Sequence, residues 1–379
     1  MKILSLFYGM ACGALAMQAA GIKIEKYIAY EVDKYAIQTA QHNFPFIEER
    51  GDVFKADFTE YAGFDYLIGG SPCTYWSIAQ TKNRETVASG MGWELFSQYV
   101  RALHEAKPRF FLYENNKSMS AAIRASITET FGFEPILINS ALVSAQNRQR
   151  LYWCGIRQAD GTYKKADIQQ PADRGILLKD ILETNAQFNV MNKELKSVEN
   201  KDAGVVGMLD MAGQEQIKRV YGTNGKCATL TTCQGGHREP KVFEKIAEPI
   251  CLNSKSGRAG VEGLQPSLQD RVYDTAGKMP AVTTCFNPKI AEPLRVNEAA
   301  KDVPIYEVKD GFITVKGNKY PIKLVDGFYI IRKLTVRECM RLQTVPEWYE
   351  WPVSKSQAYK MLGNGWTVEV IAHILRGLK

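Results

Sequence analysis

The sequence predicts an α/β protein built on an open, doubly wound sheet, with a smaller, mostly β domain inserted into it. An apolar run at residues 3–8 is followed by a turn with two glycines and then by a helical stretch. Further strand-length apolar runs alternate with helical stretches as far as about residue 156, which is typical of βαβ units. From about residue 160 the runs shorten, Gly, Thr, Lys and Gln become more frequent, and helical periodicity fades.

This change of character sets the expected domain boundaries. We expect a first domain at 1–160, a mostly β domain at 161–327, and a C-terminal segment, 328–379, that returns to the first domain. The expected strands are 3–8, 27–30, 64–68, 110–113, 135–139 and 151–156, and the expected helices are 14–20, 34–43, 93–106 and 368–378. Asp33 is expected to cap the second helix, and Thr335 with Glu338 fits a capping box.

Composition narrows the class of protein. Hydrophobic content of 45% and charged content of 23% are ordinary for a globular domain, and no apolar run is long enough for a membrane span. The first residues are a poor match to a secretory signal. The eight cysteines are scattered without a Cys-x-x-Cys pair and only four histidines are present, so we expect no metal site and a reduced, cytoplasmic setting. The net charge of +7 is a mild indication of a polyanionic partner.

The stretch Gly69-Gly70-Ser71-Pro72-Cys73 follows the apolar run 64–68. Glycines break the strand and a proline stiffens the turn, which presents a cysteine where open α/β sheets bind ligands. This placement favours a nucleophile. A lone cysteine is more often a small buried residue, so the stretch alone leaves both alternatives open.

The first strand and glycine turn predict a nucleotide-like ligand. Glu31 ends the second strand about twenty residues after the turn, where a carboxylate accepts hydrogen bonds from a ribose. Asp52 follows the next strand–helix unit of the chain. Its carboxylate is suited to accept a hydrogen bond from an adenine amino group, and it is equally suited to a turn that faces solvent.

Two polar clusters are expected at the same edge of the sheet as Cys73. Glu114-Asn115-Asn116 ends the strand 110–113, and Gln146, Arg148 and Arg150 alternate in an extended segment, which directs them to one face. The polar stretch 74–92, with Lys82 and Arg84, is long enough to be a functional loop.

The second domain contains an internal repeat. The segment 219–233 recurs as 271–285, at an offset of 52 residues, with the shared pattern Arg-Val-Tyr-x-Thr-x-Gly-Lys and a Thr-Thr-Cys ending. We expect both copies to build one sheet. The alternative is that each copy has its own edge for contact with a partner.

These residues together resemble the DNA (cytosine-5) methyltransferases, over about 1–156 and 328–379. The motifs that carry the resemblance are Phe7-x-Gly9, Glu31, Asp52, Ser71-Pro72-Cys73, Glu114-Asn115, Gln146-x-Arg148-x-Arg150 and Gly363-Asn364. The opening motif looks like the animal de novo type, and the segment 356–360 looks like compact bacterial and phage enzymes of restriction-modification systems. The chain departs from the family pattern at Ala11-Cys12, Asn116 and Gly365-Trp366.

The resemblance implies a reaction and its catalytic residues. Cys73 would attack C6 of a cytosine flipped out of double-stranded DNA, Glu114 would act as the acid at N3, and Arg150 with Arg148 would donate to the base carbonyl. The cofactor would be S-adenosyl-L-methionine, with S-adenosyl-L-homocysteine as product and no metal. The implied cofactor residues are Phe7, Tyr8, Gly9, Gly13, Glu31, Val32, Asp52, Val53, Pro72, Asn364 and Trp366.

The resemblance also makes 1–160 a catalytic and cofactor-binding domain and 161–327 a target-recognition domain. The implied DNA-binding residues are Ser71, Gln146, Lys82, Arg84, Thr229, Thr231, Gly235 and Gly236. The threonines are equally compatible with ordinary strand positions.

Two rival functions remain open on the sequence: an enzyme of the same fold that acts on RNA, and a DNA-binding regulator without activity. The intact set Cys73, Glu114 and Arg150 argues against the regulator, and the large insertion favours duplex DNA. We expect a monomer in the cytoplasm of a bacterial or phage-infected cell, not bound to a membrane. A cognate restriction endonuclease that acts separately is left open.

Overall fold

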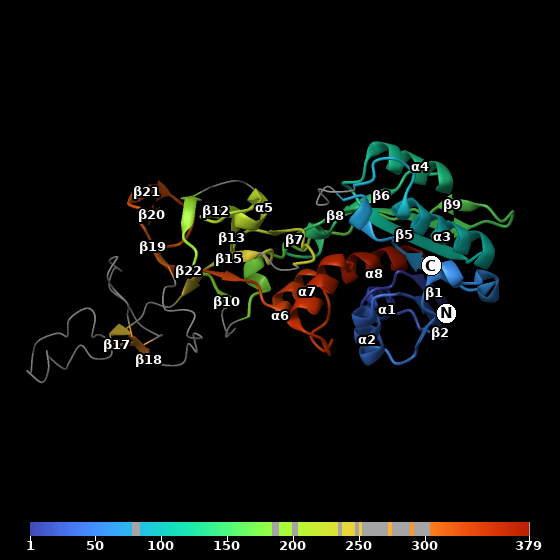
Figure 1. Ribbon diagram of the computed structural model, residues 1–379, viewed down its shortest axis with the longest axis horizontal. Helices are drawn as coiled ribbons and strands as arrows, with labels where there is room; N and C mark the ends of the chain where they lie inside the picture. The colour runs from blue at the N-terminus through green and yellow to red at the C-terminus, as the bar shows by residue number, and fades with distance from the viewer. Residues whose placement is uncertain are drawn as a thin grey trace, which may run out of the picture. The chain divides into compact units, whose positions relative to one another are not determined.

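The computed structural model describes residues 1–77, 84–183, 189–198, 204–233, 237–246, 250–251, 272–274, 289–291 and 304–378 (Figure 1). The chain forms two compact units. Unit 1 comprises Met1–Ile176, Thr229–Gly235 and Cys339–Lys379, and unit 2 comprises Leu177–Ala228 and Gly236–Glu338.

The unit boundaries differ from those expected at 160 and 328, for reasons of strand pairing. The short strand β9, Tyr163–Lys165, pairs with β8, Gln149–Arg157, and so keeps the chain in unit 1 beyond residue 160. The strand β22, Gly327–Lys333, pairs with β15 and β19 of unit 2. The segment Thr229–Gly235, expected in the second domain, belongs to unit 1.

Unit 1 is built on a mixed sheet with the strand order β3-β2-β1-β4-β5-β8-β6, and β9 pairs with β8. The first five strands in this order are parallel, whereas β8 runs antiparallel to both of its neighbours β5 and β6. The predicted doubly wound α/β sheet is confirmed. Because the chain leaves β1 for β2 on one side and reaches β4 on the other, β1 and β4 flank the switch point where such sheets bind ligands. The remaining strands of unit 1 are β1 Lys2–Leu6, β2 Lys26–Tyr30, β3 Ile47–Glu49, β4 Tyr66–Gly69, β5 Phe110–Asn116, β6 Ile136–Asn139 and β7 Gln146–Asn147.

Helices cover both faces of this sheet (Figure 1). Neighbouring residues of β4 face opposite ways: Leu67 shares a buried cluster with Phe96 of α3 and Ile123 of α4, whereas Ile68 faces Gly13 of α1. The helix α8 packs beside α1. The helices are α1 Cys12–Ala19, α2 Lys34–Asn43, α3 Met91–Ala106, α4 Ala121–Phe131, α6 Val336–Leu342, α7 Lys355–Asn364 and α8 Val368–Gly377.

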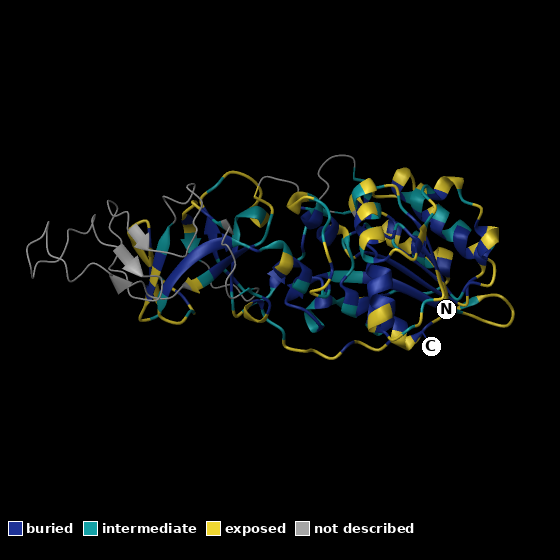
Figure 2. Cartoon of the chain, turned by 90° about the horizontal axis from the view of Figure 1, so that it is seen from below, coloured by how far each residue is buried: buried dark blue, intermediate teal, exposed yellow. Residues whose placement is uncertain are grey.

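Unit 2 is mostly β, as predicted. Its main sheet has the order β11-β12-β13-β15-β22-β19-β20-β21, with β10 beside β22. The buried side of the sheet is aromatic and aliphatic, and the rings of Phe243 and Tyr329 stack at a centroid distance of 4.9 Å. Figure 2 colours the described residues by burial and shows buried stretches along the strands. The elements are β10 Asn189–Val190, β11 Leu195–Val198, β12 Val205–Leu209, α5 Glu215–Lys218, β13 Arg219–Gly222, β14 Cys227–Ala228, β15 Lys241–Ile246, β16 Ile250–Cys251, β17 Val272–Asp274, β18 Lys289–Ala291, β19 Ile305–Lys309, β20 Phe312–Val315 and β21 Asn318–Pro321.

The two copies of the internal repeat lie in different sheets, so the expectation of one shared sheet is wrong. The strand β13 of the first copy pairs in parallel with β15 in the main sheet. The strand β17 of the second copy pairs in parallel with β18 in a separate sheet of three strands. Of the second copy the structure describes 272–274, and in each copy the described strand thus pairs in parallel with a strand that follows that copy in the chain. Sequence similarity identified the repeated unit but carries no information on which strands pair with each other.

The capping box expected at Thr335 and Glu338 is confirmed. The Thr335 backbone N–H donates to Glu338 Oε2 at 2.8 Å, and the Glu338 N–H donates to Thr335 Oγ1 at 3.2 Å. The Glu338 carboxylate also accepts two hydrogen bonds from the guanidinium of Arg332, and neither side chain is exposed. A buried ion pair of this geometry fixes the end of β22 to the start of α6.

The cap of α2 generates a stability prediction. Asp33 Oδ1 accepts from the Tyr35 N–H at 3.0 Å, and Oδ2 accepts from Lys360 Nζ at 2.7 Å. Partial burial opposes ionisation, but the Lys360 and backbone hydrogen bonds hold the pKa of Asp33 below its usual value. Asp33→Ala should therefore lower the free energy of unfolding by about 1–2 kcal/mol at pH 7.

The pH dependence of this effect follows from the lowered pKa. The ionised carboxylate stabilises the fold above the ordinary carboxyl value near pH 4, and this contribution is lost as the pH falls through the lower folded-state value. Urea unfolding of wild type, Asp33→Ala and Asp33→Asn at pH 7 and at pH 3 measures it. Equal destabilisation by Asp33→Ala at both values would contradict the assignment.

Candidate active site

The glycine turn after β1 has an unusual backbone. The φ values of Phe7, Gly9 and Ala11 are 55°, 56° and 63°. They lie in the left-handed region, which residues other than glycine rarely adopt. Such conformations cluster at functional sites because the surrounding structure must hold them in place. Here the Phe7 N–H donates to Tyr30 O at 2.9 Å, and the Gly9 N–H donates to Glu31 Oε2 at 3.0 Å.

Glu31 is fixed by backbone donors at the end of β2. Its Oε1 atom accepts from the N–H groups of Val32 and Asp33 at 2.8 and 3.0 Å, and its Oε2 atom accepts from the Gly9 N–H. Three backbone N–H groups thus fix the positions of both carboxylate oxygens. The structure thus places a fixed acceptor beside the glycine turn.

Glu49 at the end of β3 is a residue that the sequence reasoning missed. Its Oε1 atom accepts from the Glu31 N–H at 3.2 Å and the Gly51 N–H at 2.7 Å, so it ties the ends of β2 and β3 together. Burial raises the pKa of Glu49, and burial together with Glu49 raises the pKa of Tyr8. The feature of the sequence that points to Glu49 is its place at the end of the third parallel strand.

The residues around Glu31 fit the adenosine part of the expected cofactor. Val32 has 74% of its surface exposed and Phe7 is half-buried, so apolar side chains lie beside a fixed carboxylate. Asp52 accepts from the Phe54 N–H at 3.0 Å and begins the short turn Val53–Lys55. A carboxylate for ribose hydroxyls and apolar surface for a purine are the donor set that a nucleoside requires. Gly13, by contrast, packs against Ile68: a Cβ there would lie 2.5 Å from Ile68 Cδ1.

The turn after β4 lies close against β5. A Cβ on Gly70 would lie 2.6 Å from Glu114 O, so only glycine fits. Ser71 is buried, its hydroxyl pairs with the Tyr113 hydroxyl at 2.7 Å, and Asn115 Nδ2 donates to Ser71 O at 3.2 Å. Ser71 therefore holds the turn, and the DNA contact expected of it stays a prediction. Pro72 is exposed, and Cys73 begins a short helical turn, Cys73–Tyr75.

Glu114 lies within β5, which continues to Asn116. Its Oε1 atom is 3.1 Å from Arg150 Nε, and both side chains are largely buried. Its Oε2 atom accepts from the Trp366 indole N–H at 2.8 Å. The structure thus joins two of the predicted catalytic residues, and it brings Trp366 to Glu114 as well. Asn364 is exposed at the end of α7.

Gln146 and Arg148 share a buried environment and bind backbone. Arg148 donates to Leu230 O at 3.4 Å, Gly363 O at 3.2 Å and Gly365 O at 2.8 Å. Gln146 has no exposed surface, and its Oε1 atom accepts from the Leu230 N–H at 3.0 Å. Both side chains hold chain segments in place, and the DNA contact expected of Gln146 and the substrate contact expected of Arg148 stay predictions.

Of the remaining expected DNA-binding residues, three lie in the described part of the chain and three lie outside it. Arg84 donates to Trp76 O at 3.2 Å and Ser118 O at 2.7 Å, and Thr229 Oγ1 donates to Asn147 O at 2.8 Å. Thr231 lies beside Gly363, where a Cβ would approach Thr231 O within 2.1 Å. Lys82, Gly235 and Gly236 lie outside the described residues.

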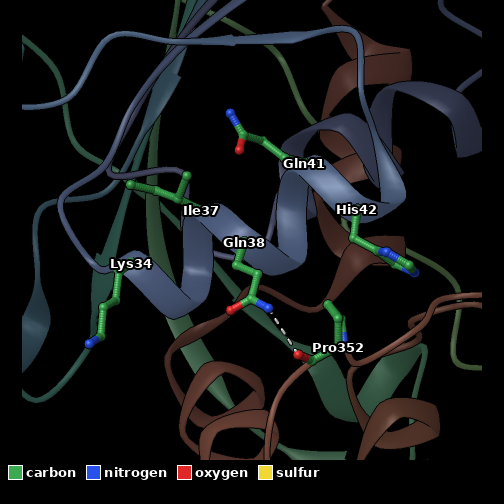
Figure 3. Close-up of a pocket in the computed structure, with 6 residues that line it drawn as sticks. All are labelled: Lys34, Ile37, Gln38, Gln41, His42 and Pro352. Atoms are coloured by element: carbon green, nitrogen blue, oxygen red, sulfur yellow. Dashed lines mark hydrogen bonds between the residues drawn. The ribbon is translucent and has the colours of Figure 1, made fainter.

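A hollow of about 590 Å³ lies elsewhere in unit 1, on α2 (Figure 3). Gln38 Nε2 donates to Pro352 O across it at 3.1 Å, and Lys34 and His42 also line it. It contains no residue of the site. Within the described part of the chain, no cluster of His, Cys, Asp or Glu side chains could hold a metal ion, and no helix is long and apolar enough to cross a bilayer.

Known proteins match this chain over its whole length. The profile of the C-5 cytosine-specific DNA methylase family matches residues 1–379. The orphan methyltransferase M.SPRI of Bacillus phage SPR is 29% identical, and the orphan methyltransferase M.SPBetaI of Bacillus phage SPbeta is 25% identical. Each alignment covers 100% of this chain and 97% of the relative. Among solved structures, the S. pombe Dnmt2 methyltransferase shares the fold with a TM-score of 0.54 at 15% identity, covering 100% of this chain and 98% of the other.

The Arg148 contacts predict a structural effect. Arg148→Lys keeps the charge but loses the planar fork that reaches three carbonyls, so it should destabilise unit 1 by about 2–4 kcal/mol. Thermal unfolding measures the loss, and hydrogen exchange should show faster exchange at Gly365. Arg124→Lys is the control, because Arg124 forms only an exposed pair with Glu134 among the contacts that the structure describes. An unchanged melting temperature for Arg148→Lys would contradict this role.

Proposed function

The chain belongs to the C-5 cytosine-specific DNA methylase family, and we propose that it methylates C5 of cytosine in a specific sequence of double-stranded DNA through a covalent Cys73–C6 intermediate. The observation that carries the proposal is the close approach of two strand ends. The β4 turn that leads to Cys73 touches the backbone of Glu114, whose carboxylate pairs with Arg150. A nucleophile and a group that acts on the ring nitrogen must both reach one base, and this contact brings their chain segments together.

The chemistry requires a nucleophile because C5 of cytosine is a weak nucleophile. Addition of the Cys73 thiolate to C6 breaks the C5=C6 double bond and moves electron density towards C5 and N3. C5 can then accept a methyl group, after which loss of the C5 proton and elimination of the thiolate restore the ring. A buried thiol such as Cys12 is unsuited to this role, because burial raises its pKa to about 11.

Glu114 and Arg150 would meet the charge that develops on the base. Glu114 would share a proton with N3, and Arg150 would donate to the neighbouring carbonyl oxygen. Both side chains are largely buried, and interactions between charges are stronger in such surroundings than they are in water. The target base must leave the duplex stack to reach them, so base flipping is part of the proposal.

Glu31, Phe7, Val32 and Asp52 would hold the cofactor, S-adenosylmethionine, at the glycine turn. When bound, the cofactor supplies an electrophilic methyl group on its sulfonium. Glu31 would accept from the ribose hydroxyls, and Asp52 would accept from the adenine amino group. Asn364 would contact the methionine end. Tyr8, Gly13 and Val53 are buried and would support the site from behind.

Unit 2 would choose the DNA sequence. It contains the strand pairs β13–β15 and β17–β18, which lie in separate sheets. Base edges would be read by hydrogen bonds and phosphates would be met by Lys and Arg. We propose a monomer that acts in the cytoplasm, where DNA of a bacterium or its phage is the substrate.

The nucleophile assignment is tested by trapping. DNA with 5-fluorocytosine at the target should form an adduct with the wild type that survives denaturation, because fluorine cannot leave C5 as a proton does. Cys73→Ala should form none. Cys154→Ala is the matched control and should still trap, because burial in β8 raises the pKa of that thiol. An adduct with Cys73→Ala would refute the assignment.

The cofactor site is tested by binding. Glu31→Ala should weaken S-adenosylmethionine binding by about 1.5–3 kcal/mol, the usual cost of losing a charged hydrogen-bond acceptor. Isothermal calorimetry measures the affinity. The control Glu48→Ala removes an exposed carboxylate of β3 that pairs with Lys26 and Arg50, and it should leave the affinity unchanged. Equal affinities for wild type and Glu31→Ala would assign Glu31 to holding the glycine turn alone.

A further inference from the structure

Trp366 makes a contact that neither the family resemblance nor the cofactor assignment explains. Its indole N–H donates to Glu114 Oε2 at 2.8 Å, although the two residues lie 252 positions apart in the chain. The same carboxylate presents its Oε1 atom to Arg150 Nε at 3.1 Å. Each oxygen of Glu114 therefore has one side-chain partner of its own: Arg150 forms an ion pair at Oε1, and Trp366 donates a hydrogen bond to Oε2.

The Gly70 turn lies beside the same carboxylate. A Cβ on Gly70 would lie 2.9 Å from Glu114 Oε2, so a side chain at position 70 would crowd this oxygen. Only 12% of the Glu114 side chain is exposed. Trp366 and Arg150 hold the largely buried carboxylate from two sides, and the glycine leaves its position undisturbed.

The segment that carries Trp366 is itself held firmly. Gly365 O accepts from Arg148 at 2.8 Å and from Gln343 at 3.3 Å. A Cβ on Gly365 would lie 3.1 Å from the Cys12 sulfur, which places this segment against the start of α1. The indole N–H is thus presented to Glu114 from a backbone that side chains fix on two sides.

We propose that Trp366 is a positioning residue for base activation: its indole N–H orients Glu114 towards N3 of the target cytosine and links the segment after α7 to the acid. This inference rests on the proposed function. Orientation matters because a proton shared with N3 stabilises the adduct only when the carboxyl group and the ring nitrogen are aligned. Trp366 acts through Glu114 and does not itself touch the reacting atoms.

The test separates this role from cofactor binding. After Cys73 adds to C6, C5 takes a proton from water; loss of the original C5 hydrogen and of the thiolate then regenerates cytosine. Release of tritium from C5-labelled cytosine in DNA, measured without cofactor, therefore reports base activation alone. Trp366→Phe keeps an aromatic ring and removes the N–H. It should lower both tritium release and kcat for methylation about ten-fold, with the KM for S-adenosylmethionine within two-fold of wild type.

The matched control is Trp351→Phe, which removes an indole N–H that donates to Met340 Sδ at 2.9 Å, away from Glu114. It should leave both rates unchanged. Unchanged tritium release in Trp366→Phe, with or without a raised KM, would overturn the proposal. If Trp366→Phe lowers the melting temperature strongly, its effect is measured in the Glu114→Gln background, where the ten-fold loss should shrink towards none. A full ten-fold loss in both backgrounds overturns the proposal.

Failure of the proposed function gives a different result. A wild type that neither releases tritium nor methylates DNA contradicts the function, and with it this inference. A wild type that does both, unaffected by Trp366→Phe, contradicts the role of Trp366 alone.

Discussion

The close packing of β1, β4 and β5 at their carboxyl ends is the constraint on which the site depends. A Cβ on Gly69 would lie 2.7 Å from Leu6 O, and one on Gly70 would lie 2.6 Å from Glu114 O. These two positions admit no side chain, because the offending atoms belong to backbone. Two glycines therefore allow the glycine turn, the Cys73 turn and Glu114 to meet at one edge of the sheet, at the switch point where such sheets bind ligands.

A second layer of buried polar groups holds this edge in place. Arg148 binds three backbone carbonyls, Gln146 binds the Leu230 N–H, and Ser71 pairs with Tyr113. Burying such groups is costly unless each finds a partner, so their hydrogen bonds fix one arrangement of the segments that they join. Arg148, Gln146 and Ser71, which were predicted to contact the base or DNA, thus also hold chain segments of the site in place.

Local patterns were sufficient to predict much of this architecture. The cap at Asp33 and the capping box at Thr335 rest on neighbours within three residues, and the Glu31 position follows from βαβ geometry. Alternation correctly placed Gln146 and Arg148 on one side of an extended segment. It could not indicate whether that side faces solvent or protein, and here it faces protein. The Trp366–Glu114 bond and the separate sheets of the repeat depend on long-range pairing, which no local pattern encodes.

We infer that this chain forms 5-methylcytosine in duplex DNA and that Cys73 is required. The most direct measurement is base-resolution sequencing of 5-methylcytosine in DNA and RNA from cells that express the wild type or Cys73→Ala. We expect 5-methylcytosine at a defined short sequence in DNA with the wild type and none with the variant. An absence of DNA methylation with the wild type, methylation confined to RNA, or an equal pattern in both strains would contradict it.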